Sequence, residues 1–193
     1  MSMQEQILVI PRSLLFEKNP AWHGVNNKVT QDTIQTITDH QKYIVRATAE
    51  TDPSYKQIIP YMVFCFNNKY FVMQRKASAS EQRLAGKLSL GIGGHMRQED
   101  IAGKTIFDWA AREFEEEVHF TGKFDIEPLG VLNDDSNEVG KVHLGLVLLL
   151  HGDSDAISIK DEHKSGILMS KQECLQKLES FENWSQLILP MLP

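Results

Sequence analysis

The chain of 193 residues is poor in cysteine and in positive charge. Its two cysteines, Cys65 and Cys174, show no spacing typical of a metal site or a disulfide framework. Cys65 stands inside an apolar run and is interpreted as a buried core thiol. Lysine and arginine number 20 against 26 aspartates and glutamates, so the formal net charge is -6. A basic surface that would bind a nucleic-acid polymer is therefore not indicated.

Long hydrophobic runs are also missing. The run 7–10 is broken by Pro11 and is too short for the core of a signal peptide. The run 144–150 is far shorter than a membrane span. We therefore expect a cytoplasmic protein that does not bind membranes. Hydrophobic residues still make up 41% of the chain, which is enough to build a core.

The order of the expected elements predicts a mixed α/β (α+β) fold in a single domain spanning residues 1–193. Residues 1–45 are interpreted as a family-specific N-terminal addition, with a strand at 5–11 and a helix at 30–40. A hairpin is expected next, with strands 61–66 and 70–75 around a turn at Asn67–Lys69. The remaining expectations are a loop at 76–85, a strand at 87–92, a helix at 105–118, strands at 124–132 and 141–151 around a polar loop at 133–140, and helices at 170–180 and 183–189.

The helix at 105–118 carries the most informative stretch, Arg112-Glu113-Phe114-Glu115-Glu116-Glu117. At about 100° per residue, spacings of three and four place Glu113, Glu116 and Glu117 on one face. Arg112 precedes Glu116 by four residues, so it can brace that carboxylate. A separate apolar stripe at core spacing consists of Phe107, Ala111, Phe114 and Val118. Thr105 and Asp108 have the spacing of a capping box at the start of the helix.

Three carboxylates on one face repel one another, by a few tenths of a kcal/mol per exposed pair. A hard cation reverses this cost, because Mg²⁺ and Mn²⁺ prefer oxygen ligands. From Glu113, Glu116 and Glu117 alone, a solvated acidic surface is the simpler interpretation. The residues before the helix favour a metal site, because the expected strand at 87–92 runs into Gly93-Gly94.

Together these residues resemble the signature of the Nudix hydrolases. Gly94 matches the opening glycine of that signature, and its second half is matched by Arg112, Glu113, Phe114, Glu116, Glu117 and Phe120. The resemblance covers about 30 of the 193 residues. It implies a mixed β-sheet sandwiched between helices. It also implies a metal-dependent hydrolase that cleaves a diphosphate (pyrophosphate) linkage in a nucleoside diphosphate-type small molecule.

The same resemblance implies a site. Glu113, Glu116 and Glu117 would hold one or more Mg²⁺ or Mn²⁺ ions, with the backbone carbonyl near Gly94 as a further ligand. One of these glutamates would accept the proton of the attacking water. Glu138 is the first candidate outside the helix for that role, although a solvated turn also explains its loop. Arg112 would orient the carboxylates.

Three departures from the signature are visible. Gly94 and Arg112 stand four residues further apart than the signature allows. Its first glutamate is missing, because Asp100 holds that place counted from Gly94 and Lys104 holds it counted from Arg112. The closing glycine is replaced by His119, which would have to end the helix without the freedom of glycine at positive φ.

Further candidates for substrate contact flank the glycine pair. His95 follows Gly94 and is either a phosphate contact or a structural histidine. Arg75 and Arg83 bracket the loop before the Gly-Gly strand and could meet phosphate oxygens. His143 lies on an expected strand, where a lone histidine is usually structural.

Two alternatives share the fold. A non-catalytic binding or regulatory module is compatible with the altered signature. An enzyme of the isopentenyl diphosphate isomerase type would need a catalytic cysteine near a strand end, whereas Cys65 is expected inside a strand. The sequence also leaves a homodimer open.

Overall fold

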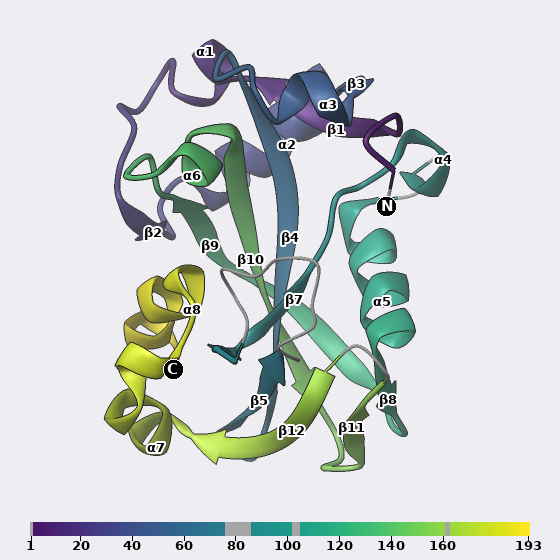
Figure 1. The fold of residues 1–193 in the computed structure, drawn as a ribbon, viewed down its shortest axis with the longest axis vertical. Helices are drawn as coiled ribbons and strands as arrows, with labels where there is room; N and C mark the ends of the chain where they lie inside the picture. Colours follow the sequence, from purple (N-terminus) through teal and green to yellow (C-terminus); the bar gives the residue numbers. More distant parts are fainter. Residues whose placement is uncertain (1, 76–85, 102–104, 161–162) are drawn as a thin grey trace. The chain divides into compact units, whose positions relative to one another are not determined.

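The computed structural model describes residues 2–75, 86–101, 105–160 and 163–193 (Figure 1). They form two compact units. The first consists of Met1–Tyr61, Gly93–Trp109 and Pro128–Val147, and the second of Met62–Ile92, Ala110–Glu127 and Leu148–Pro193. Elements with residues in both units are β4 (Tyr55–Phe66), β7 (Gly91–Gly93), α5 (Ile106–Glu117), β9 (Phe124–Asn133) and β10 (His143–Gly152).

The first unit contains most of the N-terminal segment. Its further elements are β1 (Gln6–Pro11), α1 (Arg12–Leu15), β2 (Gly24–Asn26), α2 (Thr30–His40), β3 (Lys42–Val45), α3 (Arg46–Ala49), α4 (Gln98–Ile101) and α6 (Glu138–Val142). Strand β1 runs antiparallel to both β3 and β4, and β2 runs antiparallel to β9. The segment interpreted as an N-terminal addition therefore supplies strands to the sheet.

The second unit contains the C-terminal segment. Its further elements are β5 (Lys69–Arg75), β6 (Leu88–Ser89), β8 (Val118–Phe120), β11 (Ile157–Ile159), β12 (His163–Ser170), α7 (Lys171–Gln176), η2 (Leu178–Ser180), α8 (Asn183–Ile188) and η3 (Leu189–Met191). Strand β5 pairs antiparallel with β4, β6 and β12, and β8 pairs with β11.

Hydrogen bonds join the main strands in the order β12-β5-β4-β10-β9-β2. The expectation of a mixed sheet flanked by helices is confirmed. Among the helices of the described ranges, none combines the length and the apolar character needed to cross a membrane.

The turn between β4 and β5 follows from its two asparagines. Asn67 and Asn68 have φ angles of 48° and 59°, a left-handed conformation that asparagine tolerates better than most residues. Two such residues match the twist of a tight antiparallel hairpin. The predicted turn is confirmed, with Lys69 already part of β5.

Several other expectations are corrected. The expected strand at 87–92 is divided into β6 and β7. The expected loop at 133–140 ends in α6, because the side chain of Asn137 accepts a hydrogen bond from the backbone of Gly140 and caps that helix. The expected helix at 170–180 ends at Gln176 and continues as η2. The expected loop at 76–85 lies outside the described residues.

A buried ammonium group organises the polar interior of the first unit. Lys56 is fully buried, and its Nζ donates hydrogen bonds to Asp135 Oδ1 at 2.7 Å and to the carbonyl oxygens of Gly140 and His143 at 2.7 and 3.1 Å. Asp135 also accepts hydrogen bonds from the guanidinium of Arg12. Burial raises the pKa of Asp135, but the hydrogen bonds from Arg12 and Lys56 outweigh it and hold that pKa well below its usual range.

This network corrects part of the interpretation of residues 133–140 as a solvated turn, because residues 136–139 are exposed whereas Asn133, Asp134 and Gly140 are buried. Asp134 is fully buried and accepts hydrogen bonds from the backbone of Ser136 at 3.0 Å and from Asn137 Nδ2 at 2.9 Å. The buried carboxylates of such a turn need hydrogen-bond donors inside the protein. Here Lys56 and Arg12, both distant in sequence from Asp135, supply such donors.

Replacing Lys56 by methionine should destabilise the protein. Lys56→Met keeps the aliphatic stem but leaves two buried carbonyls and one side of Asp135 without their donor, so we expect a loss of about 3 kcal/mol in the free energy of unfolding, measured by urea denaturation. Lys28→Met, at an exposed position, should change this energy little. Because the folded-state pKa of Asp135 is lowered, its stabilisation is present above its unfolded pKa and is lost as the pH falls. The difference between Lys56→Met and the unmodified protein should therefore shrink below about pH 4.

Candidate functional site

Helix α5 begins where its sequence predicts. The backbone N–H of Thr105 donates to Asp108 Oδ2 at 2.8 Å, and Thr105 Oγ1 accepts from the backbone N–H of Asp108 at 3.2 Å. This reciprocal pair satisfies donors that the first turn of a helix leaves unpaired. The predicted capping box is therefore confirmed.

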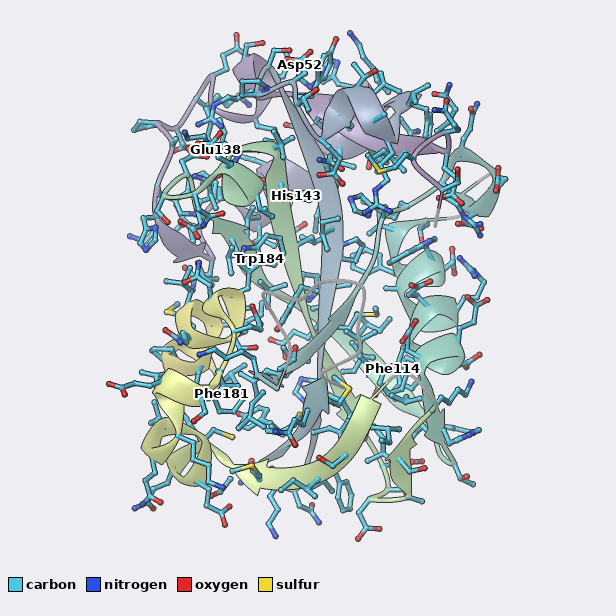
Figure 2. The ribbon with its side chains drawn as sticks, viewed as in Figure 1. Asp52, Phe114, Glu138, His143, Phe181 and Trp184 are labelled. Carbon is cyan, nitrogen blue, oxygen red and sulfur yellow. The ribbon has the colours of Figure 1, made fainter. Side chains whose placement is uncertain are left out.

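Apolar packing fixes the orientation of the part of α5 that belongs to the second unit. Phe114 is fully buried (Figure 2). Its ring stacks on Phe64 with centroids 5.7 Å apart and meets the edge of Phe124 at 5.1 Å. The predicted stripe is partly wrong, because Phe107 and Ala111 are only half-buried. The buried apolar residues along this stretch are Ile106, Trp109, Ala110, Phe114 and Val118.

The predicted contact between Arg112 and Glu116 is present. Arg112 Nη1 donates to Glu116 Oε1 at 2.5 Å, and Nη2 lies 4.0 Å from Glu113 Oε2. The guanidinium thus stands beside two of the three carboxylates. Glu113 is nearly buried, with 9% of its surface exposed, whereas Glu117 is half-buried and the side chain of Glu116 is 57% exposed. The set combines an inner carboxylate with outer ones that solvent reaches.

The replacement of the closing glycine by His119 has a structural explanation. Helix α5 ends at Glu117, and Val118–Phe120 continue directly as strand β8. Among the described residues other than glycine, only Asn67 and Asn68 have positive φ. The expectation that His119 ends the helix is therefore wrong, because the helix ends at Glu117 and the chain leaves it in an extended conformation.

The glycine pair belongs to the first unit. A Cβ atom on Gly93 would lie 2.9 Å from the carbonyl oxygen of Pro60, so only glycine allows this approach to β4. Gly94 follows it and leads to His95. The lengthened loop contains α4, where Arg97 binds both carboxylate oxygens of Asp100 at 2.7 and 2.9 Å. Asp100, which holds the place of the missing glutamate, is thus engaged with a neighbouring arginine.

His95 lies in a cluster with Glu50 and His143, and Figure 2 marks His143 at the start of β10. His95 Nε2 lies 3.2 Å from His143 Nε2 and 3.9 Å from Glu50 Oε1. Burial lowers the pKa of His95 to about 3 and also lowers the pKa of His143, so both rings are neutral at pH 7. The sequence pattern singled out the two histidines separately but carried no signal for Glu50.

The remaining predicted site residues make their described contacts elsewhere in the chain. Glu138 begins α6 with its side chain 89% exposed, and it pairs with Lys141 at 2.5 Å (Figure 2). Arg75 ends β5, where its backbone is in register with that of His163. Arg83 lies outside the described residues.

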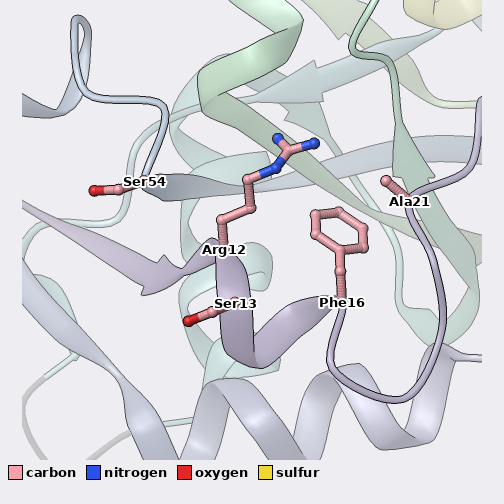
Figure 3. A pocket seen from close by; sticks show the side chains of 5 residues that line it. All are labelled: Arg12, Ser13, Phe16, Ala21 and Ser54. Carbon is pink, nitrogen blue, oxygen red and sulfur yellow. The ribbon is translucent and has the colours of Figure 1, made fainter.

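A surface pocket and the contacts of Cys65 are features that the sequence analysis did not predict. A shallow surface pocket in the first unit, drawn in Figure 3, is lined by Arg12, Ser13, Phe16, Ala21 and Ser54. The Cζ atom of Arg12 lies 5.0 Å from the centre of the Phe16 ring, a cation–π arrangement. Because Arg12 is also paired with Asp135, its charge is already partly compensated.

Cys65 is half-buried rather than a core thiol, and it is the penultimate residue of β4. Its Sγ lies 3.4 Å from His151 Nδ1, and His151 Nε2 lies 2.8 Å from Glu127. Burial and the charge of Glu127 raise the pKa of the thiol, which disfavours the thiolate that a nucleophilic cysteine needs.

Comparison with known proteins relates this fold to solved structures. No family model matches the chain. The solved structure of Tm1382, a protein assigned to the Nudix hydrolases, superposes with a TM-score of 0.81 and 27% sequence identity over 96% of this chain and 97% of that one. A bifunctional NMN adenylyltransferase/ADP ribose pyrophosphatase from Francisella tularensis shares the fold, with a TM-score of 0.53 and 18% identity over 71% of this chain and 40% of that one.

The mixed sheet, the helix with its Arg112-Glu113 and Glu116-Glu117 pairs, and the superposition on Tm1382 place the chain in the Nudix hydrolase family. Among its curated relatives is Protein YmaB of Bacillus subtilis (strain 168). The two sequences are 35% identical over an alignment of 204 positions, gaps included, that covers 98% of each chain. The similarity thus extends over nearly the whole molecule, including the N-terminal segment that supplies β1 and β2.

The contact between Arg112 and Glu116 should be measurable as an energetic coupling. In a double-mutant cycle, Arg112→Ala and Glu116→Gln should each destabilise the protein, by about 1 kcal/mol for Arg112→Ala, and together by less than the sum. Urea denaturation of the four proteins gives the coupling energy. Glu115→Gln is the matched control, because Glu115 is exposed and three residues from Arg112 in the same helix. A coupling with Glu115 as large as that with Glu116 would contradict a specific brace.

Proposed function

We propose that the protein is a divalent-metal-dependent hydrolase that cleaves a diphosphate linkage in a nucleoside diphosphate-type small molecule. The observation that carries this proposal is the carboxylate face of α5, with Arg112 hydrogen-bonded to Glu116 and close to Glu113. Membership of the Nudix hydrolase family supports the reaction class.

The residues of α5 fit Mg²⁺ or Mn²⁺. Glu113, Glu116 and Glu117 offer oxygen ligands from one helix face, which is the donor chemistry that both ions prefer. Carboxylates that share one helix face gain stability from a cation, and Arg112 supplies one positive charge beside Glu113 and Glu116. Glu113 is nearly buried on this face, with its Oε2 atom 4.0 Å from Arg112 Nη2.

When bound, the ions would neutralise the diphosphate and lower the pKa of a coordinated water. The chain's own residues have three tasks. Glu113, Glu116 and Glu117 would hold the ions, and the carbonyl of Gly94 is proposed as a further ligand. Arg112 keeps Glu116 in place by its hydrogen bond. Glu117, which is half-buried, or Glu138, which is exposed, would accept the proton of the attacking water.

The proposed substrate is a small nucleotide-type molecule rather than a nucleic-acid polymer. The formal charge of -6 opposes binding of a long polyanion, whereas a short diphosphate needs only a local positive charge. The ADP ribose pyrophosphatase of Francisella tularensis, which shares the fold, gives one class of substrate to test first. His95, Arg75 and Arg83 remain proposed contacts to the substrate.

A binding module without hydrolysis is the second candidate. The observation that favours it is the engagement of Asp100 with Arg97, which leaves the place of the first signature glutamate without a carboxylate free to serve the site. The isomerase alternative is less well supported, because the raised pKa of Cys65 opposes nucleophilic chemistry at that thiol.

Turnover should depend on Glu117 and little on Asp100. In a panel of nucleoside diphosphate derivatives assayed with Mg²⁺ and with Mn²⁺, we expect Glu117→Gln to lower turnover roughly a hundredfold or more, as removal of a group that acts in the transition state does. Asp100→Asn is the matched carboxylate-to-amide control and should keep most of the activity.

Two outcomes would redirect the proposal. An equal loss in Asp100→Asn and Glu117→Gln would mean that Asp100 does the work of the missing glutamate. Binding of a nucleotide without release of phosphate or of a nucleoside monophosphate, under both metals, would favour the binding module. Circular dichroism of each variant separates a loss of turnover from a loss of fold.

A further inference from the structure

We propose that Glu50, His95 and His143 form a second metal site, made by residues outside the carboxylate face of α5 and suited to a transition ion of the Zn²⁺ type. The three residues come from segments far apart in sequence within the first unit. Glu50 caps the C-terminal end of α3, His95 follows β7, and His143 is the first residue of β10. This inference does not depend on the proposed hydrolase activity.

The distances fit a common ion. The ligand atoms of the three side chains all lie within 4.8 Å of one another. His95 Nε2 and His143 Nε2 are 3.2 Å apart, and two nitrogen ligands about 2.1 Å from a tetrahedral ion stand about 3.4 Å apart. Glu50 Oε1 lies 3.9 Å from His95 Nε2, within a small side-chain adjustment of the same geometry. Two histidines and one glutamate form a ligand set that binds Zn²⁺ and leaves one position open.

The hydrogen bonds around the cluster orient its ligand atoms. His143 Nδ1 lies 2.7 Å from the carbonyl oxygen of Val139, which can only accept, so Nδ1 carries the proton. The lone pair of His143 is then on Nε2, the atom that faces His95. Metal-binding histidines are commonly held in this way by a carbonyl on the opposite ring nitrogen.

Glu50 is oriented by a comparable contact. Arg46 Nε donates to Glu50 Oε1 at 3.0 Å, the same oxygen that lies 3.9 Å from His95 Nε2, and this bond holds the carboxylate beside the two histidines. Arg46 also brings a positive charge close to the cluster, and Lys56 contributes another near His143. These two cations limit the affinity, and histidine nitrogens, which bind transition ions more strongly than Mg²⁺, offset that limit.

The competing interpretation is a hydrogen bond between two neutral histidines with no ion. His95 Nε2 would then carry a proton and donate it to His143 Nε2. Binding of an ion replaces that proton, so the two states differ in whether His95 Nε2–H is present. A metal titration distinguishes them directly, without any measurement of hydrolysis.

The test is titration of the full-length, metal-free protein with Co²⁺, followed by visible absorption. Four-coordinate Co²⁺ absorbs more strongly than hydrated Co²⁺, so we expect an absorption band that saturates at one equivalent and is abolished by added Zn²⁺. Glu50→Gln should weaken Co²⁺ binding at least about tenfold, and His95→Gln and His143→Ala should remove the band. Zn²⁺ should raise the melting temperature of the unmodified protein, raise that of Glu50→Gln by less, and leave that of His95→Gln unchanged.

Two control variants separate this cluster from the other candidate ligands. Glu117→Gln removes a carboxylate of α5 and should leave the Co²⁺ band unchanged. His151→Ala removes the partner of Cys65 and should also leave it unchanged. Absence of a band, unchanged Co²⁺ affinity in folded Glu50→Gln, a band that survives in folded His95→Gln, or a band lost in either control would overturn the proposal. Circular dichroism establishes that each variant is folded. If His143→Ala does not fold, Glu50→Gln, at a partly exposed position, still tests the site.

Discussion

The buried ammonium group of Lys56 holds together the part of the first unit in which several candidate residues lie. One nitrogen atom binds the carboxylate of Asp135 and the carbonyls of Gly140 and His143, so it joins β4 to the end of α6 and the start of β10. A buried amine without partners would be very costly, and this requirement fixes the backbone around it. The ring of His143 takes its position from that backbone and from the carbonyl of Val139.

The second unit places its functional residues by apolar packing instead. Phe114 is stacked on Phe64 and contacts Phe120 and Phe124, which sets the rotation of α5 about its axis. With that rotation fixed, the carboxylates at spacings of three and four must share a face. Arg112 compensates part of their repulsion, and the remaining negative charge is the chemical basis for expecting a divalent cation there.

The departures from the family signature are accommodated without disturbing this helix. The lengthened loop carries α4 and the pairing of Arg97 with Asp100, and the change of glycine to His119 falls in the extended strand β8. The spacing from Arg112 to Glu117 is intact, so the face that would hold metal keeps its local geometry. What these changes alter is the route of the chain between Gly94 and α5, where the first signature glutamate would have stood.

The sequence by itself determined the features that depend on neighbours a few residues apart. Helix α2, the capping box at Thr105, the contact between Arg112 and Glu116, and the turn at Asn67-Asn68 all follow from such spacings. It could also support the family, because the glycine pair and the glutamate block lie within one short segment. Only the tertiary structure decided which distant residues meet. The cluster of Glu50, His95 and His143, the burial of Asp134, and the pairing of β12 with β5 bring together segments that are separated along the chain. No periodicity encodes such contacts, because they depend on how strands align and on which buried polar groups must find a partner.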